Sequence, residues 1–196
     1  SVVAGLLAAL AAAALVGFLQ GSIIARLKVP AFIVTLGGGF VLRGVALLLS
    51  DNSTVIGLPP GVRDYGNEAL MYFIPGSEGG LYFFHRPEVS GELVRSMDRI
   101  LPYPVIIAAV VVILTAYLLK KTVFGRHTYA IGGNQEAALR AGIPVDRHLI
   151  LLYMLSASTS AVAGFLSTLR FTAGSAVIGD PLLMSSIAAV IIGGVS

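Results

Sequence analysis

Three long apolar segments constrain the fold of this chain more than any other feature of its sequence. Each is close to the roughly 20 residues that a helix needs to cross the ~30 Å hydrocarbon core of a bilayer, and they occupy residues 1–25, 100–119 and 149–169. Only 12% of the residues are charged, about half the share that is usual in soluble domains. The sequence therefore predicts an all-α fold, a polytopic bundle of transmembrane helices.

Two further apolar segments are candidates for membrane spans. Residues 30–50 are long enough, although they contain Arg43 and a run of three glycines at 37–39. Residues 181–196 have the composition of the first part of another span. We expect one transmembrane domain over residues 1–196. Because the sequence begins and ends inside apolar runs, we also expect it to be truncated at both ends.

The basic residues predict how the spans are oriented. The segment 120–148 contains five Lys or Arg residues against two acidic residues, and the short segment 21–29 adds Arg26 and Lys28. The segment 51–99 contains four Arg against seven acidic residues. Since loops rich in Lys and Arg face the cytoplasm, we expect 120–148 and 21–29 on the inner side of the membrane and 51–99 on the outer side.

The segment 51–99 is too long to be a simple connection. It is rich in Gly and Pro and carries a cluster of aromatic residues, which are Tyr72, Phe73, Tyr82, Phe83 and Phe84. One interpretation is a short cap on the outer membrane surface. The other, which the composition favours, is an irregular loop whose aromatic side chains lie at the interface.

Small residues recur where helices are expected to meet. Gly17 and Gly21 form a GxxxG pair, and a second series steps by four through Ser156, Ser160, Gly164 and Thr168. In lipid, close approach over small residues holds helices together, since apolar burial supplies little driving force there. The pattern predicts a tightly packed bundle and by itself says nothing about function.

The sequence motifs of several enzyme classes are absent. There is no GxxxxGK[ST], no HExxH and no GxSxG. The three histidines, His85, His127 and His148, lie in loops without the surrounding carboxylates of a metal site. We expect no catalytic residues, no cofactor, no metal and no nucleic-acid partner.

A short charged helix is predicted between the spans 100–119 and 149–169. Asn134 is a good N-cap, Glu136 lies in the first turn, Gly142 suits a left-handed C-terminal position and Pro144 prevents continuation. About two turns, roughly 11 Å, cannot span a bilayer. Such a slim, rigid helix is suited to a groove on a partner protein, although a plain connecting helix at the surface would show the same signals.

This helix and two other blocks resemble a known family. The spacing of Glu136, Ala137, Ala138 and Gly142 is similar to the EAA loop of ABC importer permeases, and TVFGRHTYAIGGNQEAALRAGIPVDR resembles that loop in permeases of the ribose, xylose and arabinose type. KVPAFIVTLGGGFVLRG (28–44) and SSIAAVIIGG (185–194) resemble two further blocks of the same family, in the same order. Many members have an acidic pair before IAAV, where this chain has Leu183-Met184-Ser185.

The resemblance implies a function and a set of partners. It implies the permease subunit of an importer for a simple sugar in the bacterial inner membrane, forming a homodimer in the lipid bilayer with cytoplasmic ABC ATPase subunits and an extracytoplasmic sugar-binding protein. The segment 120–148 would be cytoplasmic. The residues expected to couple the permease to the ATPase are Gly133, Asn134, Glu136, Ala137, Ala138, Arg140 and Gly142.

The translocation path is expected to involve the span 30–50. A charge among apolar residues usually faces a bundle interior or a watery cavity, and glycines permit a helix break or close packing. The candidates are Thr35, Gly37, Gly38 and Arg43. Arg43 could instead snorkel toward an interface, and Asp180 is expected to be a turn or cap residue before Pro181.

Two alternative functions remain open at this point. The first is a permease for branched-chain amino acids, whose family is distantly similar. The second is a channel or secondary carrier that works without ATP. Ionisable residues inside the spans would favour that second alternative, and among the spans above only Arg43 qualifies.

Overall fold

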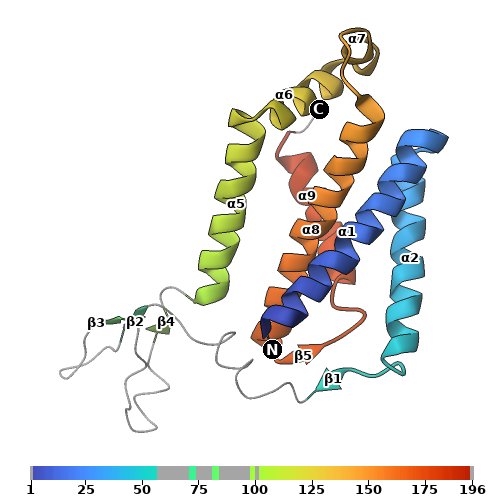
Figure 1. Cartoon of the computed structure of the whole chain (residues 1–196). Coiled ribbons are helices and arrows are strands. Elements are labelled where there is room, and N and C mark those ends of the chain that lie inside the picture. The colour runs from blue at the N-terminus through green and yellow to red at the C-terminus, as the bar shows by residue number, and fades with distance from the viewer. Residues whose placement is uncertain (1, 57–70, 74–80, 84–97, 100–101, 195–196) are drawn as a thin grey trace, which may run out of the picture.

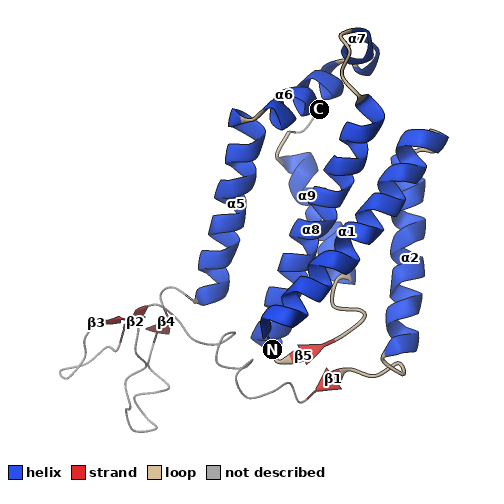
Figure 2. Cartoon of the chain, in the orientation of Figure 1, coloured by secondary structure: helices blue, strands red, loops and turns tan. Residues whose placement is uncertain are grey.

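Four long helices carry the apolar segments of the chain. The computed structural model describes residues 2–56, 71–73, 81–83, 98–99 and 102–194 (Figure 2). By length and composition, four helices in this described part could each cross a membrane: α1 (Val2–Leu27), α2 (Ala31–Leu49), α5 (Tyr103–Lys121) and α8 (Val145–Phe171) (Figure 1). They lie over the first four segments for which the sequence predicts spans.

Prolines mark where three of these helices begin. Pro30 directly precedes α2, Pro102 precedes α5 and Pro144 precedes α8. Proline has no N–H to donate and its φ is fixed near the helical value, so it is tolerated at a helix start and disrupts an interior. The fifth apolar segment forms α9 (Asp180–Ile192), whose 13 residues are fewer than a full crossing needs.

The segment 120–148 contains two helices where the sequence predicted one. The helix α6 (Val123–Gly133) follows α5 almost directly, and α7 (Gln135–Arg140) is the short capped helix that the sequence predicted. The apolar pattern over 123–133 is interrupted by glycines and charges, which is why α6 is not evident from the sequence.

Short strands accompany the helices. Strand β1 (Val55–Ile56) pairs antiparallel with β5 (Ala173–Gly174), and β2 (Met71–Phe73) lies between β3 (Leu81–Phe83) and β4 (Asp98–Arg99). These described parts of 51–99 differ from the irregular loop that composition favoured, because Tyr-Phe pairs have a high strand propensity. Phe84 and His85 lie outside the described residues.

Figure 1 shows how the ends of the bundle differ. The α1–α2 connection, α6 and α7 lie at one end, and the strands of the described residues, β1 to β5, lie at the opposite end. The two segments rich in basic residues, 21–29 and 120–148, therefore share one end. We call this the α7 end of the bundle.

The tightest packing in the described structure is between α1 and α8. A Cβ atom added at Gly17 would lie 2.6 Å from the Tyr153 carbonyl oxygen, and one added at Gly21 would lie 2.9 Å from Ile150 Cα. Only glycine permits this approach of two backbones, as the GxxxG pattern predicts. The second small-residue series behaves differently, because Ser156, Ser160 and Gly164 are exposed.

Large apolar surfaces remain uncovered on the other helices. None of the residues of α2, α5 or α9 is buried. The close packing that the sequence predicts is therefore present between α1 and α8 and does not extend over the whole bundle. In a membrane protein, such faces are covered by lipid or by further protein.

Candidate functional site

The segment between α5 and α8, residues 122–144, forms a bent pair of helices that we call the α6–α7 elbow. Thr122 starts it. The Thr122 side-chain oxygen accepts a hydrogen bond from the Gly125 N–H at 3.4 Å and its hydroxyl donates to the Leu118 carbonyl at 2.5 Å. The same side chain thus caps α6 and bonds to the last turns of α5, so it holds the corner between the two helices.

The helix α7 is capped at both ends. The Asn134 Oδ1 atom accepts from the Ala137 N–H at 2.9 Å, as the N-cap prediction requires. At the other end, Gly142 has φ 83°, and the N–H groups of Gly142 and Ile143 donate to the carbonyls of Leu139 and Ala138. This pair of bonds is a Schellman motif, which needs a left-handed residue at its centre. The caps fix a helix that is too short to be stable alone.

One face of α7 is buried and the rest is exposed. Ala138 is 4% exposed, so its small side chain packs inside the chain. The other residues predicted to couple to the ATPase, which are Gly133, Asn134, Glu136, Ala137, Arg140 and Gly142, are exposed. Leu139, an apolar residue that the prediction omitted, is 63% exposed on the same short helix.

The charges of α7 pair with each other. Arg140 Nη2 donates to Glu136 Oε1 at 2.7 Å across one helical turn, and both side chains are mostly exposed. An exposed pair of this kind adds at most about 0.5 kcal/mol to helix stability. Glu136 is therefore free to contribute more to contacts outside the chain than to its fold.

A buried histidine joins the two helices that flank α7. His148, on α8, is 5% exposed, and its Nε2 atom lies 2.8 Å from Thr128 Oγ1 on α6. The Thr128 hydroxyl donates to the Phe124 carbonyl at 3.0 Å. A hydroxyl has one proton to donate, so in this arrangement the Thr128 oxygen accepts a hydrogen bond from the Nε2–H of His148.

Two aromatic rings complete this contact. The ring centroids of Phe124 and His148 are 4.5 Å apart, and those of His127 and His148 are 5.8 Å apart. From the sequence, the histidines were predicted to lie in loops, and no role was assigned to them. No local pattern could have found the contact, because Thr128 and His148 are 20 residues apart and α6 itself was not predicted.

The four residues predicted for the translocation path all lie on α2 but do not share a face. At about 100° per residue, Gly37 lies about 160° around the helix from Thr35 and about 100° from Gly38. Gly38 approaches the Gln20 side chain of α1, whereas Gly37 faces open space. The Thr35 hydroxyl donates to the Ala31 carbonyl at 2.9 Å. The helix runs through all three glycines, so the break that they permit does not occur.

Arg43 has a partner that the sequence did not suggest. Its Nη1 atom lies 2.5 Å from Asp180 Oδ2, at the first residue of α9. Asp180 was expected to be a turn or cap residue, but it is the first residue of α9; Gly179 is the N-cap residue and no side chain caps α9. Arg43 therefore links two helices rather than reaching to an interface alone.

The fold and the elbow define a polytopic membrane protein with a small exposed helix at one end. The family model described as "Branched-chain amino acid transport system / permease component" matches residues 1–196. The chain therefore belongs to this family of transport-system permeases, which are non-catalytic membrane components.

Several curated relatives are similar to most of this chain. The fructose import permease protein FrcC of Rhizobium meliloti is 34% identical over 93% of this chain and 45% of its own length. The L-arabinose transport system permease protein AraH of Escherichia coli is 35% identical over 90% and 45%. The xylose transport system permease protein XylH of Haemophilus influenzae is 30% identical over 97% and 60%. The chain spans about half the length of these relatives. No solved structure matches it.

Proposed function

We propose that this chain is part of the permease subunit of an ATP-driven importer for a monosaccharide in the bacterial inner membrane. The observation that carries the proposal is the doubly capped, exposed helix α7, held between two apolar helices. The sugar class is supported by relatives whose names specify fructose, arabinose and xylose transport. A relative in Escherichia coli is named as an inner membrane ABC transporter permease.

In this proposal α7 receives force from a cytoplasmic ATPase subunit. Its caps keep it rigid, and its exposed surface offers Glu136, Leu139 and Arg140 to a groove on the partner. A rigid element transmits displacement to the elements that it contacts, whereas a frayed one absorbs it. We therefore assign the predicted coupling set to this contact, except for Ala138, which packs inside the chain.

The elbow gives the displacement a route into the membrane helices. The bond between His148 and Thr128 connects α8 to α6, and Thr122 connects α6 to α5. The glycine contact then connects α8 to α1. Movement of α7 would shift α5, α8 and α1 as one body relative to α2, whose glycine-rich faces and Arg43 we propose to line part of the path.

The remaining partners follow from the same proposal. Sugar would arrive from an extracytoplasmic binding protein and enter between two copies of the permease. The α7 end would face the cytoplasm, in accord with its basic residues. The strands at the opposite end, including β1 and β5, would then lie on the side of the binding protein.

A second candidate substrate class is favoured by one specific observation. The matching family model is described by branched-chain amino acid transport. Since no described residue distinguishes a sugar hydroxyl from an amino acid, the substrate must be tested directly. A carrier that works without ATP would have no ATPase subunit for the capped, exposed α7 helix to contact.

Uptake by the full-length permease tests both the mechanism and the substrate. Cells expressing the permease with its ATPase and binding protein are supplied with labelled ribose, xylose, arabinose, fructose or leucine. We expect ATP-dependent uptake of a monosaccharide, and we expect Glu136→Ala to lower that uptake at least tenfold without reducing the amount of folded permease. Uptake of leucine alone would assign the second class. Full monosaccharide uptake by Glu136→Ala would contradict the role of α7.

A further inference from the structure

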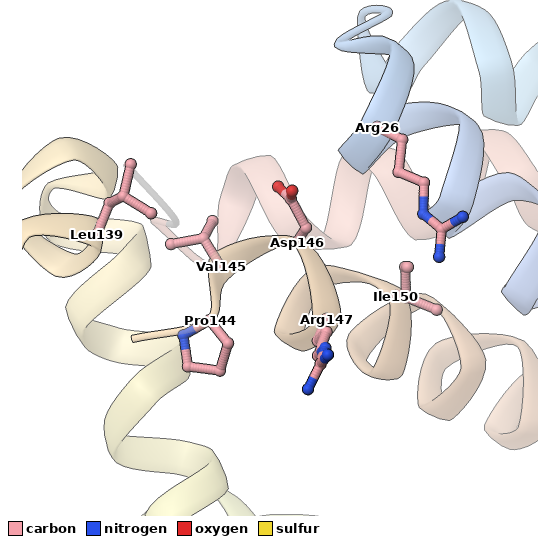
Figure 3. A pocket seen from close by; sticks show the side chains of 7 residues that line it. All are labelled: Arg26, Leu139, Pro144, Val145, Asp146, Arg147 and Ile150. Carbon is pink, nitrogen blue, oxygen red and sulfur yellow. The ribbon is translucent and has the colours of Figure 1, made fainter. Parts of the chain in front are cut away.

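The ion pair of Arg43 with Asp180 lies at a depth where charged side chains are uncommon. Figure 3 shows the ordinary case, in which Arg26 and Asp146 lie in the terminal turns of α1 and α8 at the α7 end. Arg43 instead lies roughly 9 Å along the helix axis from Leu49, the last residue of α2. A charge inside a membrane-spanning helix is costly unless it is paired or faces water, and it usually marks a functional site.

This ion pair connects the helix α9 to α2. The helix α9 has no buried residue and no side-chain N-cap. The hydroxyls of Ser185 and Ser186 donate to carbonyl groups of α9 itself. Among the described residues, Asp180 is therefore the side chain of α9 that makes a polar contact with another helix.

A turn separates this ion pair from a second contact at the end of the bundle that carries the strands, which we call the strand end (Figure 1). Strand β5 follows α8 and pairs with β1, which follows α2, through residues 173–174 and 55–56. Residues 175–179 connect β5 to α9. The hydrogen bonds of this turn are local, such as that from the Asp180 N–H to the Val177 carbonyl at 3.2 Å. If the ion pair opened, α9 could pivot about the turn while β1 and β5 stayed paired.

The exposure of the ion pair suits a contact that breaks and re-forms. Arg43 Nη1 lies 2.5 Å from Asp180 Oδ2, and both side chains are half-exposed. An ion pair that water can reach is weaker than one in a dry interior, because water stabilises the separated charges. In contact with lipid, the same separated charges would be costly. The pair therefore opens only where water or a polar solute replaces the lost partner.

We propose that Arg43 and Asp180 form a latch, which fixes α9 against α2 and opens when solute enters from the strand end. In the proposed transport cycle, on which this inference rests, α8 moves relative to α2. Since α9 follows α8 through β5 and the turn, this movement pulls Asp180 away from Arg43. Arg43 is then a positioning residue that acts through Asp180.

ATP hydrolysis by the complete transporter in proteoliposomes tests the latch. The variants Arg43→Gln and Asp180→Asn break the ion pair, and R43D/D180R re-forms it with the charges exchanged. The matched control is Arg170→Gln, which removes an exposed positive charge from the last turn of α8, at the strand end. Should the exchanged pair fold poorly, R43C/D180C in a cysteine-free protein supplies a second measurement. A short bis-methanethiosulfonate reagent joins its two thiols, and a reductant releases them.

We expect the loss of the latch to raise ATP hydrolysis in the absence of the binding protein, because the ion pair no longer opposes the accompanying conformational change. From the modest strength of a half-exposed ion pair, the rate should rise about fivefold in Arg43→Gln and in Asp180→Asn, and change less than about twofold in R43D/D180R and Arg170→Gln. The rate of R43C/D180C should also be raised, fall about fivefold when the thiols are joined, and rise again after reduction.

Three outcomes would overturn the latch. They are a folded R43D/D180R variant whose rate stays raised, joined thiols that leave the rate of R43C/D180C unchanged, and equal rates in Arg43→Gln and Arg170→Gln. Uptake by the unmodified complex separates these outcomes from failure of the proposed function. If the unmodified complex does not take up a monosaccharide with ATP, the proposed function is contradicted, and the latch with it.

Discussion

At the scale of single residues, the contact between α1 and α8 depends on two glycines of α1, which have no Cβ atom. Gly17 and Gly21 let the two backbones approach, and Ala25 continues the same buried face one turn later. Each glycine costs about 1 kcal/mol of helix propensity relative to alanine. The close approach that they permit must offset this cost.

Alanine at position 17 should therefore destabilise the protein despite its better helix propensity. The added Cβ would lie 2.6 Å from the Tyr153 carbonyl oxygen and 2.7 Å from Met154 Cα, both of which are backbone atoms that cannot rotate away. We expect Gly17→Ala to lower the free energy of unfolding by about 1–3 kcal/mol, measured by thermal unfolding of the full-length permease in detergent.

Gly44 provides the control for this change. It lies within α2, and a Cβ added there meets nothing within 4 Å. Gly44→Ala should be neutral or slightly stabilising, because only the gain in helix propensity remains. Equal effects of the two substitutions would show that the α1–α8 contact is not as close as the structure describes.

The second residue-scale prediction concerns His148. Replacing it with alanine removes the bond to Thr128 and opens space beside Phe124. We expect His148→Ala to retain ATP hydrolysis by the assembled transporter while lowering substrate uptake at least fivefold, because α6, which carries α7, is no longer firmly connected to α8. The measurement is the ratio of ATP hydrolysed to substrate transported in proteoliposomes.

Glutamine at position 148 tests whether the hydrogen bond to Thr128, rather than the volume of the histidine ring, positions the elbow. Its amide N–H can donate to Thr128 Oγ1, as the Nε2–H of histidine does. We expect His148→Gln to restore most of the coupling ratio. A glutamine variant as uncoupled as the alanine variant would mean that the hydrogen bond does not position the elbow.

At the scale of elements, the helix α7 is specified by local signals and the elbow around it is not. Asn134 and Gly142 cap the predicted helix because caps act through the backbone of neighbouring residues. By contrast, Thr128 with His148 and Arg43 with Asp180 join residues far apart in sequence. Such contacts depend on how helices pack, and a single sequence carries no periodic signal for them.

The membrane-spanning helices show the same difference between features that local sequence specifies and features that depend on packing. Their apolar length is a local property, so α1, α2, α5 and α8 lie close to the expected boundaries. The face that each helix buries is not local. The series at Ser156, Ser160 and Gly164 is exposed, whereas the equally simple pair Gly17 and Gly21 is buried. Sequence spacing alone could not have told which small-residue series meets another helix.

Gly142→Ala tests whether the cap of α7 matters for function. The left-handed conformation at φ 83° costs an alanine about 1–2 kcal/mol, so the end of α7 should fray. We expect faster hydrogen exchange over residues 138–143 and at least tenfold lower uptake. Gly132→Ala, within α6 and with nothing within 4 Å of the added Cβ, should change neither. Normal uptake by Gly142→Ala would contradict a mechanical role for α7.

At the scale of the whole molecule, the described structure is open rather than closed. The helices α2, α5 and α9 have no buried residue, and the ion pair of Arg43 with Asp180 links two of them at half-exposed side chains. The chain spans about half the length of its curated relatives. In a membrane, such exposed apolar faces are covered by lipid or by further protein.

The most direct test of the account is a cross-link between α7 and the ATPase in the complete assembly. The chain contains no cysteine, so Leu139→Cys, at a position 63% exposed, can be labelled with a benzophenone maleimide in a cysteine-free full-length protein. Tyr129→Cys on α6, at a position 65% exposed, is the control. The account predicts a nucleotide-dependent cross-link from position 139 to the ATPase subunit and a much weaker one from position 129. Cross-links from position 139 only to lipid, or equal yields from the two positions, would contradict it.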